Sequence, residues 1–175
     1  MNSLIIYSTT DGHTKKICEF IKSNSLYKNT CEIVSLDTAL KIKLETYDRI
    51  IIGASIRYGK HNSKLYDLVK INKDLLSSKK SAFFSVNVVA RKKEKNSPET
   101  NPYIKKFLKK SRWQPSKIGV FAGKIDYPNL NFFNRRIIQL IMLITNGPTD
   151  LKKSYELTDW SSVKDFTKKI DELVN

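Results

Sequence analysis

Four hydroxyl side chains, a carboxylate, a glycine and an imidazole lie within residues 8–14, one residue after the apolar run at residues 4–6. Hydroxyl groups, free backbone N–H groups beside a glycine and the positive end of a helix dipole together suit a phosphate. The same residue types also cap helices and build turns, so this segment by itself leaves capping and phosphate binding equally open. These residues, here termed the phosphate loop, are Ser8, Thr9, Thr10, Asp11, Gly12, His13 and Thr14.

Asp11 fits a phosphate least, because its carboxylate repels a dianion. We expect it to turn outward or to shape the loop by accepting a hydrogen bond from a nearby backbone N–H. The segment has neither the Gly-Lys pair of a Walker loop nor three spaced glycines, so it matches no standard nucleotide-binding motif.

Two further loops follow expected strands and carry basic or polar groups. Because ligands of open α/β sheets bind at the carboxyl ends of the strands, these loops are candidates to meet the phosphate loop at one edge of the sheet. The 55–59 loop consists of Ser55, Ile56, Arg57, Tyr58 and Gly59. The 87–91 loop consists of Asn87, Val88, Val89, Ala90 and Arg91.

The elements that would position these loops alternate between strand and helix. Short apolar or β-branched runs predict strands at residues 3–8, 31–36, 50–53, 81–90 and 116–125. Helical spacing predicts helices at 14–26, from Asn62 or Ser63 onward, from Thr100 with Pro102 in its first turn, and from Thr158 or Asp159 onward. Continuous apolar strands are typical of a parallel sheet covered on both faces. The pattern therefore predicts one α/β domain over residues 1–175.

Composition and net charge limit the classes of partner that this chain can have. The chain has 175 residues, 40% of them hydrophobic, and a formal net charge of +15. Such a charge fits nucleic acid, an anionic membrane or an anionic substrate, although the abundance of Lys, Asn and Ile also fits a biased genome. Cys18 and Cys31 have neither metal-ligand nor redox-pair spacing, so we expect two packing thiols and no metal site. No signal peptide is expected at the N-terminus.

The phosphate loop, the strand "YDRIIIGAS" and the five-strand pattern together resemble the flavodoxin family. That resemblance implies a three-layer flavodoxin-like sandwich, a parallel sheet in the order 2-1-3-4-5, and FMN as cofactor. It places the FMN phosphate at Ser8 to Thr14 and favours phosphate binding over simple capping.

The middle and end of the chain resemble a narrower family more closely. The segments "GASIRYGKHNS", "SVNVVARKKEKNSPETNPYIKKFL", "AGKIDYP", "LIM", "GPTD" and "TDW" occur in this order. Together they are similar to the flavodoxin-like, menaquinone-dependent protoporphyrinogen oxidases of bacterial haem synthesis. The resemblance implies an FMN oxidoreductase that oxidises protoporphyrinogen IX to protoporphyrin IX and passes the electrons to menaquinone or ubiquinone.

Carried over by residue, the resemblance implies that the 55–59 and 87–91 loops border the isoalloxazine ring, with Tyr58 able to stack on it. Arg57, Lys60 and Arg91 are the nearest basic side chains for the substrate carboxylates, and the alternative for each is a solvated charge or a flavin neighbour. No acid or base stands out as catalytic. His13 and His61 are no more than guesses for that role.

An apolar and basic insert is expected at about residues 126–150, after the fifth strand. Residues 137–144 are apolar except for Gln139, and Arg135 and Arg136 precede them. The run is far shorter than the roughly 20 residues that span a bilayer. It can lie in the interface of an anionic membrane, pack internally against the sheet, or form an apolar lip for substrate or quinone. The first use predicts peripheral binding on the cytoplasmic side of the inner membrane.

Two rival functions stay open. An electron-carrier flavodoxin without its own organic substrate shares the fold, but such carriers are acidic and lack the insert. A nucleic-acid-binding module would use the basic cluster at residues 91–95, yet no recognised binding motif accompanies it, so no nucleic-acid partner is expected. A homo-oligomer is possible.

Overall fold

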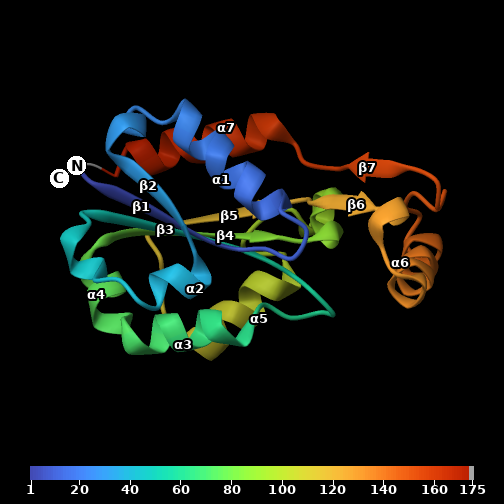
Figure 1. Cartoon of the computed structure of the whole chain (residues 1–175), viewed down its shortest axis with the longest axis horizontal. Coiled ribbons are helices and arrows are strands. Elements are labelled where there is room, and N and C mark those ends of the chain that lie inside the picture. Colours follow the sequence, from blue (N-terminus) through green and yellow to red (C-terminus); the bar gives the residue numbers. More distant parts are fainter. Residues whose placement is uncertain (174–175) are drawn as a thin grey trace.

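A computed structural model of the protein describes residues 1–173, and these form three layers (Figure 1). The central layer is a five-stranded sheet in the order β2-β1-β3-β4-β5, and each neighbouring pair is parallel. This order confirms the flavodoxin-like topology expected from the sequence. The strands are β1 (Ser3–Ser8), β2 (Cys31–Ser35), β3 (Arg49–Ser55), β4 (Lys80–Val86) and β5 (Lys117–Phe121).

Helices cover both faces of the sheet, which explains why its central strands bury apolar residues on both sides. In β3, Ile50 and Ile52 pack on one face while Ile51 packs on the other. One face carries α1 (His13–Asn24) and α7 (Trp160–Asp171). The other carries α2 (Leu36–Ala39), α3 (Ser63–Ile71), α4 (Lys73–Ser78) and α5 (Pro102–Ser111). Short 3-10 turns lie at Lys28–Thr30, Leu44–Thr46, Val88–Arg91, Lys93–Lys95 and Tyr127–Asn129.

Several predicted boundaries differ from the structure. The helix expected from residue 62 breaks at Asn72, whose side chain donates a hydrogen bond to the Leu68 carbonyl and ends α3. Asn101, and not Thr100, caps α5, because its side chain accepts from the N–H groups of Tyr103 and Ile104. Asn62 and Asp159 cap α3 and α7 as expected.

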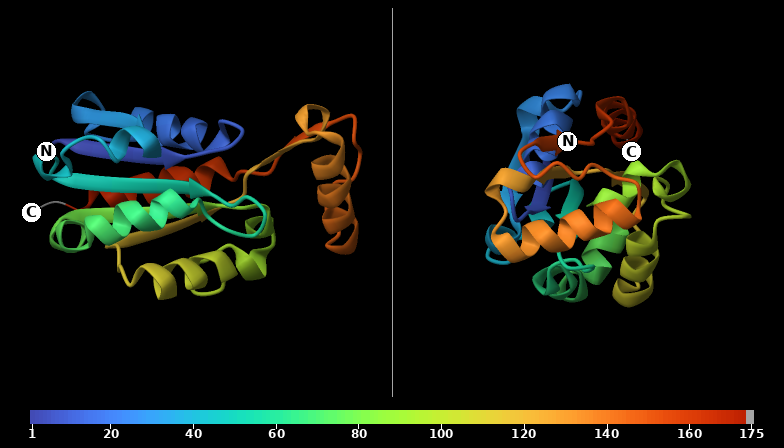
Figure 2. Two further views of the ribbon diagram at one scale, coloured as in Figure 1. Left: turned by 60° about the horizontal axis from the view of Figure 1, so that its bottom comes forward. Right: turned by 90° about the vertical axis from the view of Figure 1, so that its right-hand side faces the viewer.

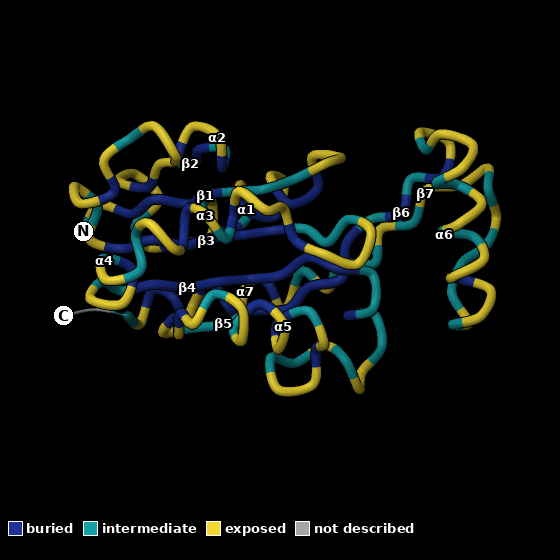
Figure 3. Tube along the Cα trace, turned by 90° about the horizontal axis from the view of Figure 1, so that it is seen from below, coloured by how far each residue is buried: buried dark blue, intermediate teal, exposed yellow. Residues whose placement is uncertain are grey.

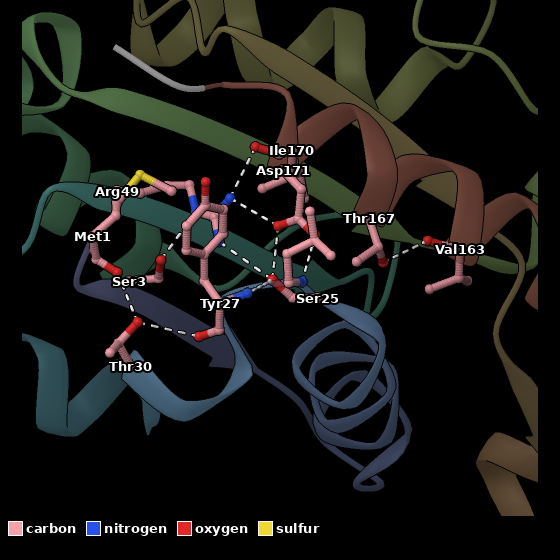
Figure 4. Close-up of polar contacts among 11 residues, drawn as sticks. Met1, Ser3, Ser25, Tyr27, Thr30, Arg49, Val163, Thr167, Ile170 and Asp171 are labelled. Carbon is pink, nitrogen blue, oxygen red and sulfur yellow. Dashed lines mark hydrogen bonds and ion pairs between the residues drawn. The ribbon is translucent and has the colours of Figure 1, made fainter.

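A buried ion pair holds α7 to the amino ends of the strands (Figure 4). The Arg49 guanidinium lies 3.0 Å from Oδ1 of Asp171 and donates further hydrogen bonds to Ser3 and to the Ile170 carbonyl. Both charged side chains are almost fully buried, at 1% and 7% exposure. This cluster lies at the end of the sheet opposite the phosphate loop, so it serves the fold.

The strand predicted at residues 116–125 is two strands. β5 ends at Phe121, and β6 (Lys124–Asp126) pairs antiparallel with β7 (Ser154–Glu156). This ribbon carries α6 (Phe132–Ile144), which stands beyond the carboxyl end of the sheet and crosses it (Figure 2). Among residues 1–173, no helix combines the length and apolarity needed to cross a bilayer.

The inserted helix α6 is largely exposed, whereas the sheet is buried (Figure 3). Its inner side packs Met142 against Ile125 and Tyr127 in a small core of its own. Its outer side leaves large apolar groups in the open, so internal packing against the sheet is wrong. The outer face, as the term is used below, consists of Phe133, Ile137, Leu140 and Ile144.

Candidate functional site

The phosphate loop forms the turn from β1 into α1. Gly12 adopts a left-handed conformation (φ 83°), which favours glycine, and its carbonyl accepts the first hydrogen bond of α1, from Lys16. The Thr9 hydroxyl accepts from the Gly12 N–H at 3.0 Å, and Oδ1 of Asp11 accepts from the His13 N–H at 3.2 Å. Asp11 thus shapes the loop by accepting a local backbone hydrogen bond, which was one of the two alternatives expected from the sequence.

Thr14 supplies a direct test of whether this loop suits an anion. Its side chain is fully buried in the first turn of α1, and among residues 1–173 its hydroxyl has no hydrogen-bond partner. A buried hydroxyl without a partner costs about 1–3 kcal/mol. The positive end of α1 and this donor lie in the same turn, so the residues present fit a phosphate group.

His13 ties the phosphate loop to the base of the insert. Its Nε2 lies 2.7 Å from the Thr158 hydroxyl, which itself donates to the Ala122 carbonyl at 2.8 Å. Because the Thr158 proton is used in that bond, Nε2 of His13 must carry the proton and donate. Burial lowers the pKa of His13, although Glu156 and Asp11 oppose the shift, and this favours the neutral ring.

The 55–59 loop curls beside the phosphate loop. Tyr58 and Gly59 both have left-handed backbones, and Arg57 and Lys60 close the turn through reciprocal backbone hydrogen bonds. The Ser55 hydroxyl donates to the Ser8 carbonyl at 3.3 Å, which joins the two loops.

A pocket of about 480 Å³ opens where these two loops meet. One wall comes from the phosphate loop and the 55–59 loop, and the other from α3 and α5. The predicted site residues that line it are Ser8, Thr9, Thr10, Ser55, Arg57, Tyr58 and Lys60. Sequence reasoning missed the opposite wall, which includes Tyr66, Lys106 and Lys110.

His61 forms the floor of this pocket and leads into a buried polar chain. Its Nε2 is 3.0 Å from the Ser85 hydroxyl, which also accepts a hydrogen bond from Asn87. Asn101 donates to Oδ1 of Asn87 at 3.2 Å and caps α5. Burial, reinforced by the nearby Lys106, lowers the pKa of His61 to about 4. These hydrogen bonds connect the pocket to the start of the 87–91 loop.

The 87–91 loop does not line the same pocket. The Asn87 side chain is buried in the polar chain just described, and Ala90 packs into the core. The Arg91 guanidinium donates to the Val88 carbonyl and to the carbonyl and hydroxyl of Thr145, at 3.1, 2.9 and 2.6 Å. Arg91 therefore fastens the C-terminal end of α6. It lines a second, shallower hollow of about 460 Å³ with Gly147 and Pro148.

Among residues 1–173, no group of three His, Cys, Asp or Glu side chains is arranged to hold a metal ion. Both cysteines are free and buried. The described residues offer an anion-binding turn and a basic pocket that can position a bound organic group.

Comparisons with known proteins agree with this geometry. A family model described as a flavodoxin domain matches residues 4–152. A Leishmania major protein named protoporphyrinogen IX dehydrogenase (quinone) is 45% identical over 166 residues, 93% of this chain and 71% of that protein. The protein of that name from Escherichia coli K12 is 40% identical over 176 residues, 100% of this chain and 97% of that protein.

Oxidised Flavodoxin 1 from Bacillus cereus matches the fold with a TM-score of 0.59 at 16% identity, covering 100% of both chains. At that identity the likeness concerns the fold alone. The family model and the two relatives go further, since they span most or all of the sequence at 40–45% identity. The chain belongs to the flavodoxin-domain family and, within it, to the oxidoreductase family of the protoporphyrinogen IX dehydrogenases (quinone).

Proposed function

We propose that this protein oxidises protoporphyrinogen IX to protoporphyrin IX with FMN as cofactor and passes the electrons to a respiratory quinone, the penultimate step of haem biosynthesis. The observation that carries the proposal is the phosphate loop with its unpartnered Thr14 beside a basic pocket, in a chain whose relatives bear that activity in their names. Membership of the flavodoxin-domain family supports a flavin cofactor.

The phosphate loop would hold the FMN phosphate, and the 55–59 loop would border the ring, since residues of both loops line the pocket. The 87–91 loop lies outside that pocket, so its place beside the ring rests on the family resemblance. When bound, FMN supplies two-electron chemistry, so three rounds remove the six electrons and six protons that separate porphyrinogen from porphyrin. The residues of this chain bind and orient the reactants. Thr14 offers the phosphate its hydroxyl, and Gly12 allows close approach of the backbone.

The alternative is an FMN electron carrier without an organic substrate of its own. The net charge of +15 and the exposed outer face of α6 favour the dehydrogenase, because a soluble carrier has no use for an apolar insert. Anaerobic mixing of the FMN-loaded protein with protoporphyrinogen IX separates the two. Loss of oxidised flavin absorbance with formation of porphyrin is expected, and an unchanged flavin spectrum would leave only the carrier.

The outer face of α6 supports a second proposal. The protein would dock from the cytoplasmic side on an anionic membrane, which contains the quinone. Phe133, Ile137, Leu140 and Ile144 recur at spacings of three and four and are 51–77% exposed. Arg136 is exposed at the same helix and is available to lipid headgroups. Arg135 was expected to share this role, but its guanidinium donates to the carbonyls of Pro128 and Leu130, so it holds the start of α6.

Sedimentation with vesicles of phosphatidylcholine and phosphatidylglycerol tests this docking. The double variant Phe133→Ser, Leu140→Ser is expected to lose most vesicle binding. The matched control is Leu26→Ser, Ile71→Ser, which removes two apolar groups that are 84% and 75% exposed elsewhere on the surface. If the control loses as much binding, or if the wild-type face instead forms dimers in sedimentation velocity without binding vesicles, the membrane proposal is wrong.

A further inference from the structure

Four basic side chains converge on the main pocket without acidic partners. Arg57 and Lys60 come from the β3–α3 connection, and Lys106 and Lys110 come from α5. Among residues 1–173 none of the four forms an ion pair, and the residues that line the pocket include no carboxylate. Other lysines of this chain do find carboxylates, as Lys64 does with Asp37. Like charges around one hollow repel one another, so their placement favours an anionic occupant.

The α5 wall of the pocket presents two lysine side chains to the hollow. Lys106 and Lys110 are one helical turn apart and therefore share a face of α5. The Lys110 ammonium lies 4.1 Å from the centre of the Tyr66 ring, which holds it toward the pocket by a cation–π contact. Asn62 and Ser63, at the start of α3, face the same hollow, so the positive end of that helix adds to the field.

Flavin and substrate would use different sides of this pocket. The phosphate loop gives this wall Ser8, Thr9 and Thr10, and the unpartnered Thr14 hydroxyl and the helix terminus that suit a phosphate follow in the same loop, outside the pocket lining. The α3–α5 wall instead offers separated point charges on long side chains beside an aromatic ring. Such a wall suits flexible carboxylates carried by an apolar ring system.

We propose that Lys106 and Lys110 bind the propionate carboxylates of the porphyrinogen and so form a substrate subsite opposite the flavin. This inference rests on the proposed function and assigns its specificity to α5. Lysine suits this role because its ammonium group sits on a flexible stem and can follow propionate arms of variable conformation. The rigid guanidinium of an arginine is less adaptable.

The test compares two double variants of α5 in the FMN-loaded enzyme. Lys106→Gln, Lys110→Gln removes the pocket charges. Lys105→Gln, Lys109→Gln removes the same total charge from the same helix at exposed positions outside the pocket. The readouts are KM and kcat for protoporphyrinogen IX, the Kd of protoporphyrin IX from its fluorescence, and the Kd values of FMN and riboflavin.

For the pocket variant, KM and the porphyrin Kd are expected to rise about tenfold, since two partly exposed ion pairs are lost. Its kcat and both flavin affinities should stay within about twofold of wild type, as should every constant of the control. With the dimethyl ester of the porphyrin, wild type and pocket variant should bind alike, because the ester has no carboxylates. The difference in porphyrin Kd between the pocket variant and the control variant should also become smaller at high salt.

Three results would overturn the subsite. Equal porphyrin affinities for pocket and control variants would show that the charge is not used locally. A fall in FMN affinity with riboflavin unaffected would assign these lysines to the flavin phosphate. A loss that persists with the dimethyl ester would remove carboxylates from the explanation. If the proposed function itself is wrong, protoporphyrinogen IX will not reduce the flavin of the wild-type protein. The comparison of porphyrin affinities between the two variants would still decide the role of α5.

Discussion

The Tyr58 hydroxyl donates a hydrogen bond of 2.9 Å to Oδ1 of Asn134 and so joins the 55–59 loop to the first turn of α6. At the other end of the helix, Arg91 holds Thr145 to the 87–91 loop. The insert is thus fastened to both loops that are proposed to border the flavin. Its position over the carboxyl end of the sheet, visible in Figure 2, follows from these two attachments and the β6–β7 ribbon.

Tyr58→Phe tests the first attachment. The variant keeps the aromatic ring but loses the hydroxyl, so the docking of α6 should weaken by about 0.5–1.5 kcal/mol. Hydrogen–deuterium exchange of the α6 amides should accelerate by a few fold, while exchange in β1 and β3 stays unchanged. FMN affinity should change little, because the ring is retained. Unaltered exchange in α6 would mean that the contact with Asn134 does not restrain the insert.

Arg91→Gln tests the second attachment and separates two roles of this residue. Loss of three hydrogen bonds from a charged donor should loosen the C-terminal end of α6 by about 1–3 kcal/mol and speed limited proteolysis near residue 146. The control Lys93→Gln removes the same charge from an exposed neighbour. A higher KM without faster proteolysis would instead favour the carboxylate-binding role expected from the sequence.

Thr14→Val replaces the buried, unpartnered hydroxyl by a methyl group of similar shape. The flavin-free protein should be as stable as wild type or slightly more so, because the hydroxyl makes no bond there. FMN affinity should fall about tenfold or more by titration calorimetry, and Thr14→Ser should restore it. Riboflavin, which lacks the phosphate, should bind both proteins alike. An equal loss for riboflavin would show that Thr14 acts on something other than the phosphate.

Asp171→Asn leaves the Arg49 guanidinium buried without its counter-charge. The free energy of unfolding should fall by about 3–5 kcal/mol in urea denaturation. The matched control on α7 is Asp165→Asn, which breaks an exposed pair with Lys168 and should cost less than about 1 kcal/mol. Similar losses for both variants would contradict a special role for the buried pair.

His61 predicts a pH dependence of stability. Burial and Lys106 lower its pKa to about 4 in the folded protein, against about 6.5 in the unfolded chain. Its contribution is therefore complete above pH 6.5 and declines by up to about 3 kcal/mol as the pH falls toward 4, where the unfolded chain takes up the proton first. His61→Gln should flatten this slope at saturating FMN. Parallel wild-type and variant curves between pH 4.5 and about 7 would be inconsistent with the shift.

The layers were predictable because β1, β3 and β4 are apolar on both faces, as is typical of a covered parallel sheet, whereas the strand order was implied only by the resemblance to the flavodoxin family. The break at Asn72 was not, since Leu75 and Leu76 continue the apolar spacing and the chain turns there through a single side-chain bond. The residue types at 8–14 left capping and phosphate binding equally open. The best support for phosphate binding, the isolated hydroxyl of Thr14, depends on neighbours that the sequence does not show.

Two features of the site lay beyond local patterns. Arg91 contacts Thr145 across 54 residues of sequence, so its engagement with α6 carries no short-range signal. Lys105, Lys106, Lys109 and Lys110 look equivalent in the sequence, and only the packing of α5 beside α3 turns one pair toward the pocket. An apolar run such as residues 137–144 also has the same pattern whether it is buried or exposed, and the structure exposes most of it while it buries Met142.

The small core of Ile125, Tyr127 and Met142 lies outside the two clusters that stabilise the sandwich. The insert therefore has a core of its own, is mounted on a two-stranded stem, and is tied to the body through Tyr58 and Arg91. Substitutions confined to the outer face of the insert would therefore leave the packing of both clusters in the flavodoxin-like body unchanged.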